Sequence, residues 1–458
     1  MIDGLKPYPQ YKETGLPWLG KVPEHWDMER AKRLFRKMDR PVRTSDDVVT
    51  CFRDGTVTLR RNRRVRGFTE SLKEIGYQGI RRGDLVIHAM DAFAGAIGVS
   101  DSDGKGTPVY SICEPNAGSN SHFYAYILRE MARSQWIQAL AKGIRERSTD
   151  FRFDDFASQK VPIPPLPEQT AIIRFLDHVD RCVRQYVRAK RLLIDRYNEL
   201  IFSLVITGDG TGNPQSGFWR MSLPNEWRIE KAKRLFDEVK VTDCPNKDLL
   251  AVTQDRGILP KKMCEQHFVS PSKNLEGLKL VRPNDFVISL RSFQGGIEHS
   301  DYEGIVSPAY IVFRLRSEFQ YPEYQYFYKY LFKSPQFIAL LATLISGIRD
   351  GKNIPYSDFA ELQLPVTPRS KISYLVSLCK EVEKYQNAVL HEINFLLEYQ
   401  KRLVADVVTG KLDVREAAEA LPEEDDEPES LVEEIAINES DEGDIEENSE
   451  NEEEADSE

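Results

Sequence analysis

The densest group of residues that could carry chemistry is a run of five arginines in the segment LRRNRRVRG, namely Arg60, Arg61, Arg63, Arg64 and Arg66. No acidic residue interrupts this run, so the arginines repel one another unless an anion neutralises them. A guanidinium group presents a planar fork of N–H donors that fits both a phosphate and the O6/N7 edge of guanine. The run therefore favours nucleic-acid binding, and a solvated run of charge is the alternative.

Further polar residues of the types that contact base edges or phosphates occupy segments that follow short apolar runs. The candidates are Arg256, Lys261 and Lys262, then His88 and Asp91 in HAMDAFAG, Arg291 and Gln294 in SLRSFQGG, and Arg145, Arg147, Arg349 and Lys352 in two GIR segments. A surface turn that touches only phosphates is the alternative for each of these loops.

The basic groups recur because the sequence contains an internal repeat. PEHWDMERAKRLF at 23–35 returns as PNEWRIEKAKRLF at 224–236, an offset of 201 residues. The same offset places GDLVI at 83–87 onto NDFVI at 284–288, and DDFASQKVPIPP at 154–165 matches SDFAELQLPVTP at 357–368 at an offset of 203. Chance matches would not keep register over several separate blocks.

Each copy of the repeat predicts a mixed α/β domain followed by a long helix. Short apolar runs bounded by turn residues are typical of strands, and amphipathic patterns around them indicate helices. We expect strands at VVTCF, DLVIHAM and PVYSIC in the first copy and at LLAVT, DFVISL and AYIVFRL in the second, and helices around AKRLF, YAYILREMARSQWIQALA and YQYFYKYLFKSPQFIALLATLI.

Two long segments, Pro165 to Gly208 and Ile372 to Val407, keep an unbroken heptad alternation of apolar residues. This rhythm is typical of helices that pack along their length, and polar residues within the seam tend to fix register. We expect an antiparallel coiled coil, with ordinary amphipathic helices of two separate domains as the alternative. The seam includes Ile172, Leu176, Val179, Leu193 and Leu200 in the first segment and Val382, Val389, Leu396 and Leu403 in the second, with Lys190, Gln386 and Gln400 as polar interruptions.

The net charge of −11 conceals a basic body. From Leu421 onward there are 20 acidic residues and no basic one, which leaves 53 acidic against 62 basic residues, a net charge of +9, for the rest of the chain. The acidic tail has the composition of a disordered segment, whereas the basic body permits nucleic-acid binding. The six cysteines form no CxxC pair, and no signal or membrane-spanning segment is evident, so we expect a cytoplasmic protein without metal.

Four motifs in the same chain resemble one known family. YKETGLPWLGKVPEHW at 11–26, PIPPLPEQTAIIRFLD at 162–177, GIVSPAYIVFRL at 304–315 and VVTGKLDVRE at 407–416 resemble the specificity subunit of type I restriction–modification enzymes. The resemblance implies an α+β fold with two pseudo-symmetric mixed α/β target-recognition domains separated by two long antiparallel coiled-coil helices. The implied parts are an N-terminal arm (1–19), recognition domains (20–165 and 215–368), spacer helices (166–210 and 369–412) and a disordered acidic tail (417–458), which the family does not need.

The resemblance also implies a function. The chain would be a non-catalytic subunit that binds double-stranded DNA at a bipartite asymmetric site. Its spacer helices would dock two methyltransferase (modification) subunits for adenine N6 methylation, and restriction (motor-nuclease) subunits would join them to cleave unmodified DNA. No cofactor is expected on this chain; S-adenosylmethionine, ATP and Mg would be held by the partner subunits.

Two other classes of function are the alternatives. Asn353-Ile354-Pro355-Tyr356 approaches the Asn-Pro-Pro-Tyr loop of adenine N6-methyltransferases, but its first proline is missing and no Gly-rich turn follows an early strand to hold S-adenosylmethionine. A coiled-coil adaptor that binds only proteins, with an acidic tail mimicking DNA, would account for the long helices. It would leave the arginine run without a role.

Overall fold

The computed structural model of the chain describes residues 5–63, 75–140, 150–208, 226–254, 257–264, 275–290, 292–344 and 354–422. The chain divides into two compact units. Unit 1 comprises Met1–Tyr186 and Asn394–Glu458, and unit 2 comprises Val187–Ile393. The tail from residue 423 onward lies outside the described residues, so its disorder stays a prediction.

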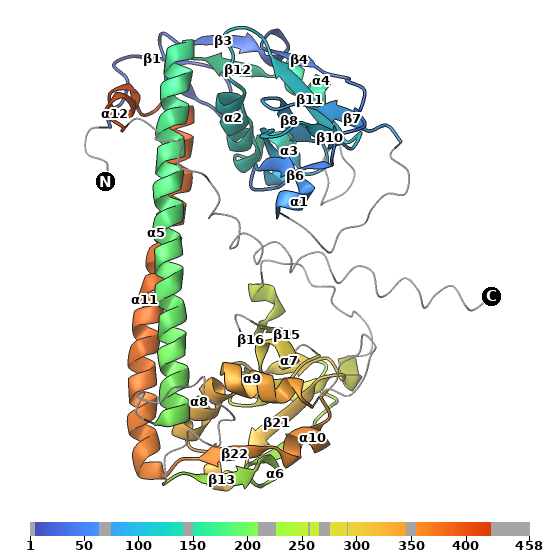
Figure 1. Cartoon of the computed structure of the whole chain (residues 1–458), viewed down its shortest axis with the longest axis vertical. Helices are drawn as coiled ribbons and strands as arrows, with labels where there is room; N and C mark the ends of the chain where they lie inside the picture. The colour runs from blue at the N-terminus through green and yellow to red at the C-terminus, as the bar shows by residue number, and fades with distance from the viewer. Residues whose placement is uncertain are drawn as a thin grey trace, which may run out of the picture. The chain divides into compact units, whose positions relative to one another are not determined.

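Unit 1 is an α+β body around a four-stranded sheet. Apart from the long helices, its elements are β1 (Tyr11–Glu13), β2 (Lys21–Pro23), β3 (Asp27–Arg30), η1 (Ala31–Arg33), β4 (Phe35–Lys37), β5 (Val49–Cys51), β6 (Val57–Leu59), α1 (Arg60–Arg63), β7 (Gln78–Ile80), β8 (Leu85–His88), η2 (Ala92–Ala94), β9 (Ile97–Val99), β10 (Gly104–Gly106), β11 (Tyr110–Pro115), α2 (Ser121–Arg133), α3 (Trp136–Leu140), α4 (Phe153–Ser158), β12 (Lys160–Ile163) and α12 (Arg415–Glu419). The main sheet is antiparallel with the order β4-β11-β8-β9, and β1-β2, β3-β12, β5-β6 and β7-β10 form two-stranded pairs (Figure 1).

Unit 2 repeats this arrangement. Its elements are β13 (Arg228–Lys231), α6 (Ala232–Leu235), β14 (Phe236–Val239), β15 (Leu250–Thr253), β16 (Gly257–Pro260), η4 (Lys261–Met263), η5 (Leu275–Gly277), β17 (Lys279–Val281), β18 (Phe286–Ile288), α7 (Ser292–Gly295), β19 (Glu298–His299), β20 (Gly304–Val306), β21 (Ile311–Leu315), η6 (Ser317–Phe319), α8 (Pro322–Leu331), α9 (Pro335–Ala342), α10 (Tyr356–Glu361) and β22 (Gln363–Val366). The sheet order β14-β21-β18-β19 and the pairs β13-β22, β15-β16 and β17-β20 match unit 1 strand for strand from β3 onward. The predicted repeat and its six apolar strands are therefore confirmed.

Alternation of side chains along the central strand positions the hairpin on each sheet. Phe286 and Ile288 belong to the core cluster that includes α8, whereas Val287 packs in the cluster formed with β15 and β16. In unit 1, Val86 packs in the same way with β5 and β6. Because successive strand residues point to opposite faces, the helix and the hairpin cover opposite sides of the sheet.

The helices that flank the sheets are shorter than the amphipathic patterns suggest. The first pattern is broken between α2 and α3, where Gln135 adopts a left-handed backbone with φ of 60°. The second is broken between α8 and α9, where the Ser334 hydroxyl caps α9 by accepting the N–H of Phe337 at 3.3 Å and Pro335 begins the new helix. The AKRLF segments form only a single turn each, η1 and α6.

The two predicted rods are helices α5 (Leu166–Thr207) and α11 (Arg369–Val408), which lie side by side within each unit (Figure 1). All three polar interruptions bind the opposite helix. Gln400 Nε2 donates to Asp180 Oδ1 at 3.0 Å in unit 1; in unit 2, Gln386 Nε2 donates to Asn198 Oδ1 at 3.0 Å and Lys190 Nζ to Glu392 Oε2 at 2.8 Å. Numbers rise on α5 as they fall on α11, so the pairing in unit 2 is antiparallel.

Among the apolar seam residues named above, burial follows the heptad pattern except at Leu200. Ile172, Leu176, Val179, Val389 and Leu403 are buried, and Leu193, Val382 and Leu396 are half-buried. Leu200 is 43% exposed, and Ile201 is buried in its place with Leu204 in the core of unit 2. The C-terminal end of α5 thus turns its apolar face to the body of unit 2. No helix among the described residues combines the length and the hydropathy needed to cross a bilayer.

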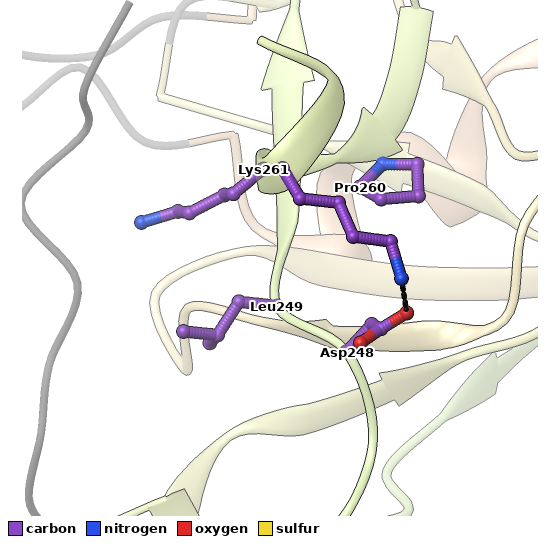
Figure 2. Close-up of a pocket in the computed structure, with 5 residues that line it drawn as sticks. Asp248, Leu249, Pro260 and Lys261 are labelled. Atoms are coloured by element: carbon purple, nitrogen blue, oxygen red, sulfur yellow. Dashed lines mark hydrogen bonds and ion pairs between the residues drawn. The ribbon is translucent and has the colours of Figure 1, made fainter.

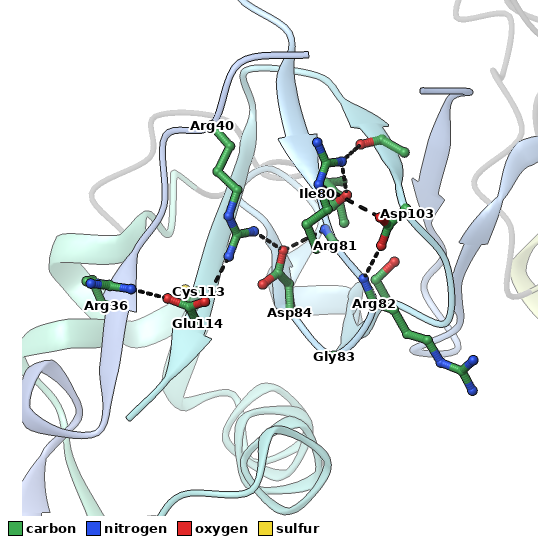
Figure 3. Close-up of polar contacts among 12 residues, drawn as sticks. Arg36, Arg40, Ile80, Arg81, Arg82, Gly83, Asp84, Asp103, Cys113 and Glu114 are labelled. Atoms are coloured by element: carbon green, nitrogen blue, oxygen red, sulfur yellow. Dashed lines mark hydrogen bonds and ion pairs between the residues drawn. The ribbon is translucent and has the colours of Figure 1, made fainter. Parts of the chain in front are cut away.

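A buried carboxylate just before the central strand is neutralised by an arginine in both units, but this arginine comes from a different segment in each unit. In unit 1, Asp84 pairs with Arg40, and Arg40 also reaches Glu114 at 3.2 Å (Figure 3). In unit 2, Arg314 binds Asp285 in a bidentate manner at 2.5 and 2.8 Å. Asp285 lies 201 residues after Asp84, but Arg314 lies 200 residues after Glu114, so the cation follows β4 in unit 1 and lies on β21, the counterpart of β11, in unit 2.

His299 gives unit 2 a dependence on pH. Its side chain is buried beside Phe286, Asp301 lies 3.6 Å away, and neither ring nitrogen has a hydrogen-bond partner among the described residues. Burial lowers the pKa of His299 to about 4. The unfolded chain therefore takes up a proton near pH 6.5 that the folded chain refuses, so this contribution to stability is present above pH 6.5 and is lost as the pH falls towards 4.

We expect unit 2 to lose about 2 kcal/mol of unfolding free energy between roughly pH 7.5 and pH 5 because of His299. The measurement is chemical unfolding followed at both pH values. The control is His299→Val, which installs the residue found at the equivalent position of unit 1, Val99. If the variant lost as much stability as the wild type over this range, another group would be responsible.

Candidate nucleic-acid interface

A short basic helix follows the same hairpin in both units. In unit 1, the β5–β6 hairpin leads into α1, which begins with Arg60; in unit 2, the β15–β16 hairpin leads into η4, which begins with Lys261. The N–H of Arg60 donates to the carbonyl of Val48 at 2.8 Å, and the N–H of Lys261 to the carbonyl of Leu249 at 2.9 Å. The fold therefore presents the two basic pairs from the same place in each unit.

The second basic residue of each pair makes the same ion pair. Arg61 binds Asp47 at 2.6 Å, and Lys262 binds Asp248 at 2.7 Å. The dashed line at Asp248 in Figure 2 marks the pair in unit 2, beside an open pocket of about 180 Å³ lined by Asp248, Leu249, Pro260, Lys261 and Lys262. All four charged side chains are more than half exposed, and such pairs contribute at most about 1 kcal/mol. Each cation can therefore leave its carboxylate for a phosphate at small cost.

The other described arginines of the run support the hairpin instead. Arg63 is only 17% exposed, pairs with Asp54 at 2.6 Å and lies 4.4 Å from the centre of the Phe52 ring. Although burial alone would raise the pKa of Asp54, the N–H of Thr56 and the Arg63 guanidinium together hold it below its usual value. Arg60 Nε donates to the Thr50 hydroxyl at 3.3 Å. The described part of the run thus consists of Arg60 and Arg63, which support the hairpin, and the exposed Arg61.

The loop after the central strand differs between the units. In unit 1, the N–H of Asp91 donates to His88 Nδ1 at 3.2 Å, and the Asp91 carboxylate binds Arg53 at 3.0 Å. Burial lowers the pKa of His88, so its ring stays neutral and packs 5.1 Å from Tyr110. In unit 2, the corresponding loop presents Gln294 to solvent. His88 is thus a loop-fixing residue, whereas Gln294 is available to a ligand.

Several predicted interface residues fall outside the described residues, and their role stays a prediction. They are Arg64, Arg66, Arg145, Arg147, Arg256, Arg291, Arg349 and Lys352.

Asp47 and Asp248 are site residues that the residue types alone did not reveal. They are acidic, and a search for basic or base-reading side chains passes over them. The signal that could have found them is the repeat, since they lie 201 residues apart, the same offset that separates Arg61 from Lys262.

The segment resembling a methyltransferase loop packs into unit 2. Asn353 lies outside the described residues, but Ile354 is buried, and the Tyr356 hydroxyl donates to the carbonyl of Phe236 at 2.9 Å. The position of Ile354 corresponds to Phe151 in unit 1, which is also fully buried. These residues serve as packing elements at a repeated turn.

Comparison with known proteins gives one family match and similar solved structures. Residues 108–187 match the family described as Type I restriction modification DNA specificity domain. A chain from a structure entitled "Structural basis underlying complex assembly and conformational transition of the type I R-M system" has 16% identity and a TM-score of 0.53, over 84% of this chain and 98% of that chain. The HsdS subunit from Thermoanaerobacter tengcongensis has 16% identity and a TM-score of 0.38, over 87% and 99% of the two chains. No curated protein matches this chain significantly in sequence.

The matched segment runs from the start of β11 through α2, α4 and β12 into the first half of α5, so it joins the sheet of unit 1 to the long helix. The structural match to the first of these solved chains covers 84% of this chain and 98% of the solved one. Residues 108–187 therefore resemble the type I restriction modification DNA specificity domain, and the chain shares its fold with a chain from a type I restriction–modification structure, in agreement with the resemblance found in the sequence.

Proposed function

We propose that this chain is the non-catalytic DNA-specificity subunit of a type I restriction–modification complex. Each unit would read one half of a bipartite asymmetric site on double-stranded DNA. The observation that carries the proposal is the repeated hairpin and basic helix, which places Arg61 and Lys262 at equivalent, exposed positions in the two units. Phosphate contacts of this kind fix the orientation of a protein on DNA without reading its sequence.

The differences between unit 1 and unit 2 support a DNA site whose two halves differ in sequence. The residues that would contact phosphates are shared, whereas the loops after the central strands differ: His88 and Asp91 occupy positions that correspond to Ser289 and Ser292. Loops of different chemistry on equivalent frames would read different base pairs. The units would thus bind DNA in a common way and select different half-sites.

Exposed aromatic residues on α11 support docking of methyltransferase subunits on the long helices. In unit 2, Tyr374 and Tyr385 are 64% and 61% exposed, and their spacing of eleven residues places them on one helical face. In unit 1, Phe395 and Tyr399 are exposed one turn apart. Large exposed apolar side chains mark interaction surfaces, and aromatic residues are enriched in them. The partners would hold S-adenosylmethionine, ATP and Mg, and the complex would act in the cytoplasm with motor-nuclease subunits.

Replacing Lys262 with glutamine tests DNA binding by unit 2. We expect the plot of the logarithm of the DNA-binding constant against the logarithm of the salt concentration to become shallower by about 1 in slope, because one phosphate contact is lost. Binding should weaken to a similar degree for all DNA sequences, since a phosphate contact carries no base information. The measurement is a titration of duplex DNA with the full-length chain at several salt concentrations.

Lys231→Gln is the matched control, since Lys231 is a partly exposed lysine of unit 2 on β13, paired with Glu361. It should leave the slope unchanged. Equal slopes for Lys262→Gln and the wild type would contradict the placement of DNA at η4. Methyl transfer to DNA by the purified chain alone would contradict the non-catalytic role.

A further inference from the structure

Two loops meet at the same edge of each unit. The first is the turn of the hairpin, which includes Arg53 and Gly55 in unit 1 and Gln254 in unit 2. The second is the central-strand loop together with the first residues of the strand that follows it: residues 89–98 in unit 1 and, of the described residues, 289–290 and 292–298 in unit 2. Under the proposed function these loops hold the candidate base-reading residues, so their relative position decides which bases they can reach.

In unit 1 the loops touch backbone to backbone. A Cβ on Gly98 would lie 1.9 Å from the carbonyl oxygen of Gly55, and a Cβ on Gly95 would lie 2.9 Å from that of Arg53. Across these loops Arg53, which is 66% exposed, pairs with Asp91 at 3.0 Å. Close approach of two main chains, which only glycine permits, thus holds the loops of unit 1 together.

In unit 2 a side chain blocks that approach. The residue 200 positions after Gly98 is Glu298, whose carboxylate is buried with 3% exposure. Lys333, just after α8, fills the space between the loops: its Nζ donates to the carbonyl of Gln254 at 3.0 Å, to the carbonyl of Gly295 at 2.9 Å and to the Glu298 carboxylate. An ammonium group has three N–H donors, and these three bonds use all of them.

The equivalent cation of unit 1 binds within its own helix instead of joining the two loops. Arg133, 200 residues before Lys333, binds Glu130 on its own helix at 2.7 and 2.6 Å. Among the described residues, a partly buried lysine therefore joins these two loops in unit 2 and not in unit 1. A buried pair costs desolvation and contributes little net stability compared with apolar packing, so its value lies in fixing geometry.

We propose that Lys333 is a positioning residue for base recognition by unit 2, holding the hairpin turn and the central-strand loop in one fixed arrangement. This inference rests on the proposed function. Because its donors are saturated, Lys333 does not itself contact DNA; it acts through Gln294 and the other residues of the two loops.

The test compares base discrimination by the full-length chain and by Lys333→Met/Glu298→Gln. The double variant avoids leaving a buried, unpaired carboxylate. The probe is a pool of duplexes randomised at both half-sites. Ethylation interference identifies the half-site bound by unit 2, because Lys262→Gln should lose a phosphate contact at that half-site only. We expect discrimination between preferred and substituted bases to fall about tenfold at this half-site and to stay unchanged at the other. Amide exchange of residues 292–297 should rise in parallel.

Two variants separate positioning from general weakening. Lys333→Arg keeps the charge and the donors and should retain discrimination within about threefold. Asp285→Asn/Arg314→Met removes a buried ion pair at the opposite end of β18 from the loop and should leave discrimination intact. Unchanged discrimination in Lys333→Met/Glu298→Gln, equal loss at both half-sites, or equal loss in the Asp285/Arg314 variant would overturn the inference. A wild-type chain without any base preference would overturn the proposed function itself.

Discussion

Replacing Asp285 with alanine should lower the unfolding free energy of unit 2 by about 3 kcal/mol. Asp285 is fully buried at the start of β18, where it accepts both N–H groups of the Arg314 fork and the backbone N–H of Arg282. Removing one member of a buried pair leaves an uncompensated charge, at a cost of about 3–5 kcal/mol. The lower end applies because Arg314 is 29% exposed and partly regains water. Hydrogen exchange of the amides of β18 and β21 measures the loss.

Asp237→Ala is the matched control within the same sheet. Asp237 lies on β14 and pairs with Arg316 at 2.7 Å, with exposures of 60% and 41%. An exposed pair of this kind contributes at most about 1 kcal/mol, so the control should change stability little. Similar losses for the two variants would show that burial does not decide the strength of these pairs.

The repeat was readable from the sequence because apolar periodicity and turn residues fix the strands locally. GDLVI and NDFVI keep one pattern of burial, since the central strand is covered on both faces in each unit. The partner of the buried carboxylate was not readable. Arg40 follows β4 and Arg314 lies on β21, and only the order of the strands in each sheet brings either of them close to the aspartate.

In the candidate site, too, the sequence predicts which residues are present but not what each of them contacts. The basic residues after the hairpin were found from their types and spacing, but their roles were not. Arg61 and Arg63 are two residues apart in one run, yet the first is 70% exposed and the second 17%. The short helix α1 turns them in different directions, and sequence pattern does not resolve orientation over a single turn. The orientation of the polar seam residues on the long helices could be predicted, because a heptad pattern fixes which side chains face the opposite helix over many turns.

Replacing Glu168 with alanine should lower the unfolding free energy of unit 1 by about 3 kcal/mol. Glu168 is buried at the start of α5 and accepts hydrogen bonds from the Tyr8 hydroxyl at 2.6 Å and from Trp26 Nε1 at 2.8 Å, with His25 Nε2 at 2.8 Å. Alanine would leave two buried donors without an acceptor, at about 1–3 kcal/mol each. Burial and the bond to Glu168 raise the pKa of Tyr8, so its hydroxyl remains a donor at all accessible pH values.

Lys371→Ala is the control that the repeat itself supplies. Lys371 lies 203 residues after Glu168 and pairs with Glu226, which lies 201 residues after His25, so the same two positions of the repeat are in contact in both units. Both partners in unit 2 are more than half exposed, and the variant should cost less than about 1 kcal/mol. Glu168 also links the N-terminal segment of unit 1 to the segment after α11. It binds Tyr8, whose ring lies beneath the Arg415 guanidinium, and nearby Lys6 and Asp413 form an antiparallel β-bridge. Loss of amide protection in Glu168→Ala should therefore begin at residues 6–13 and 411–415; uniform loss across unit 1 would contradict this local role.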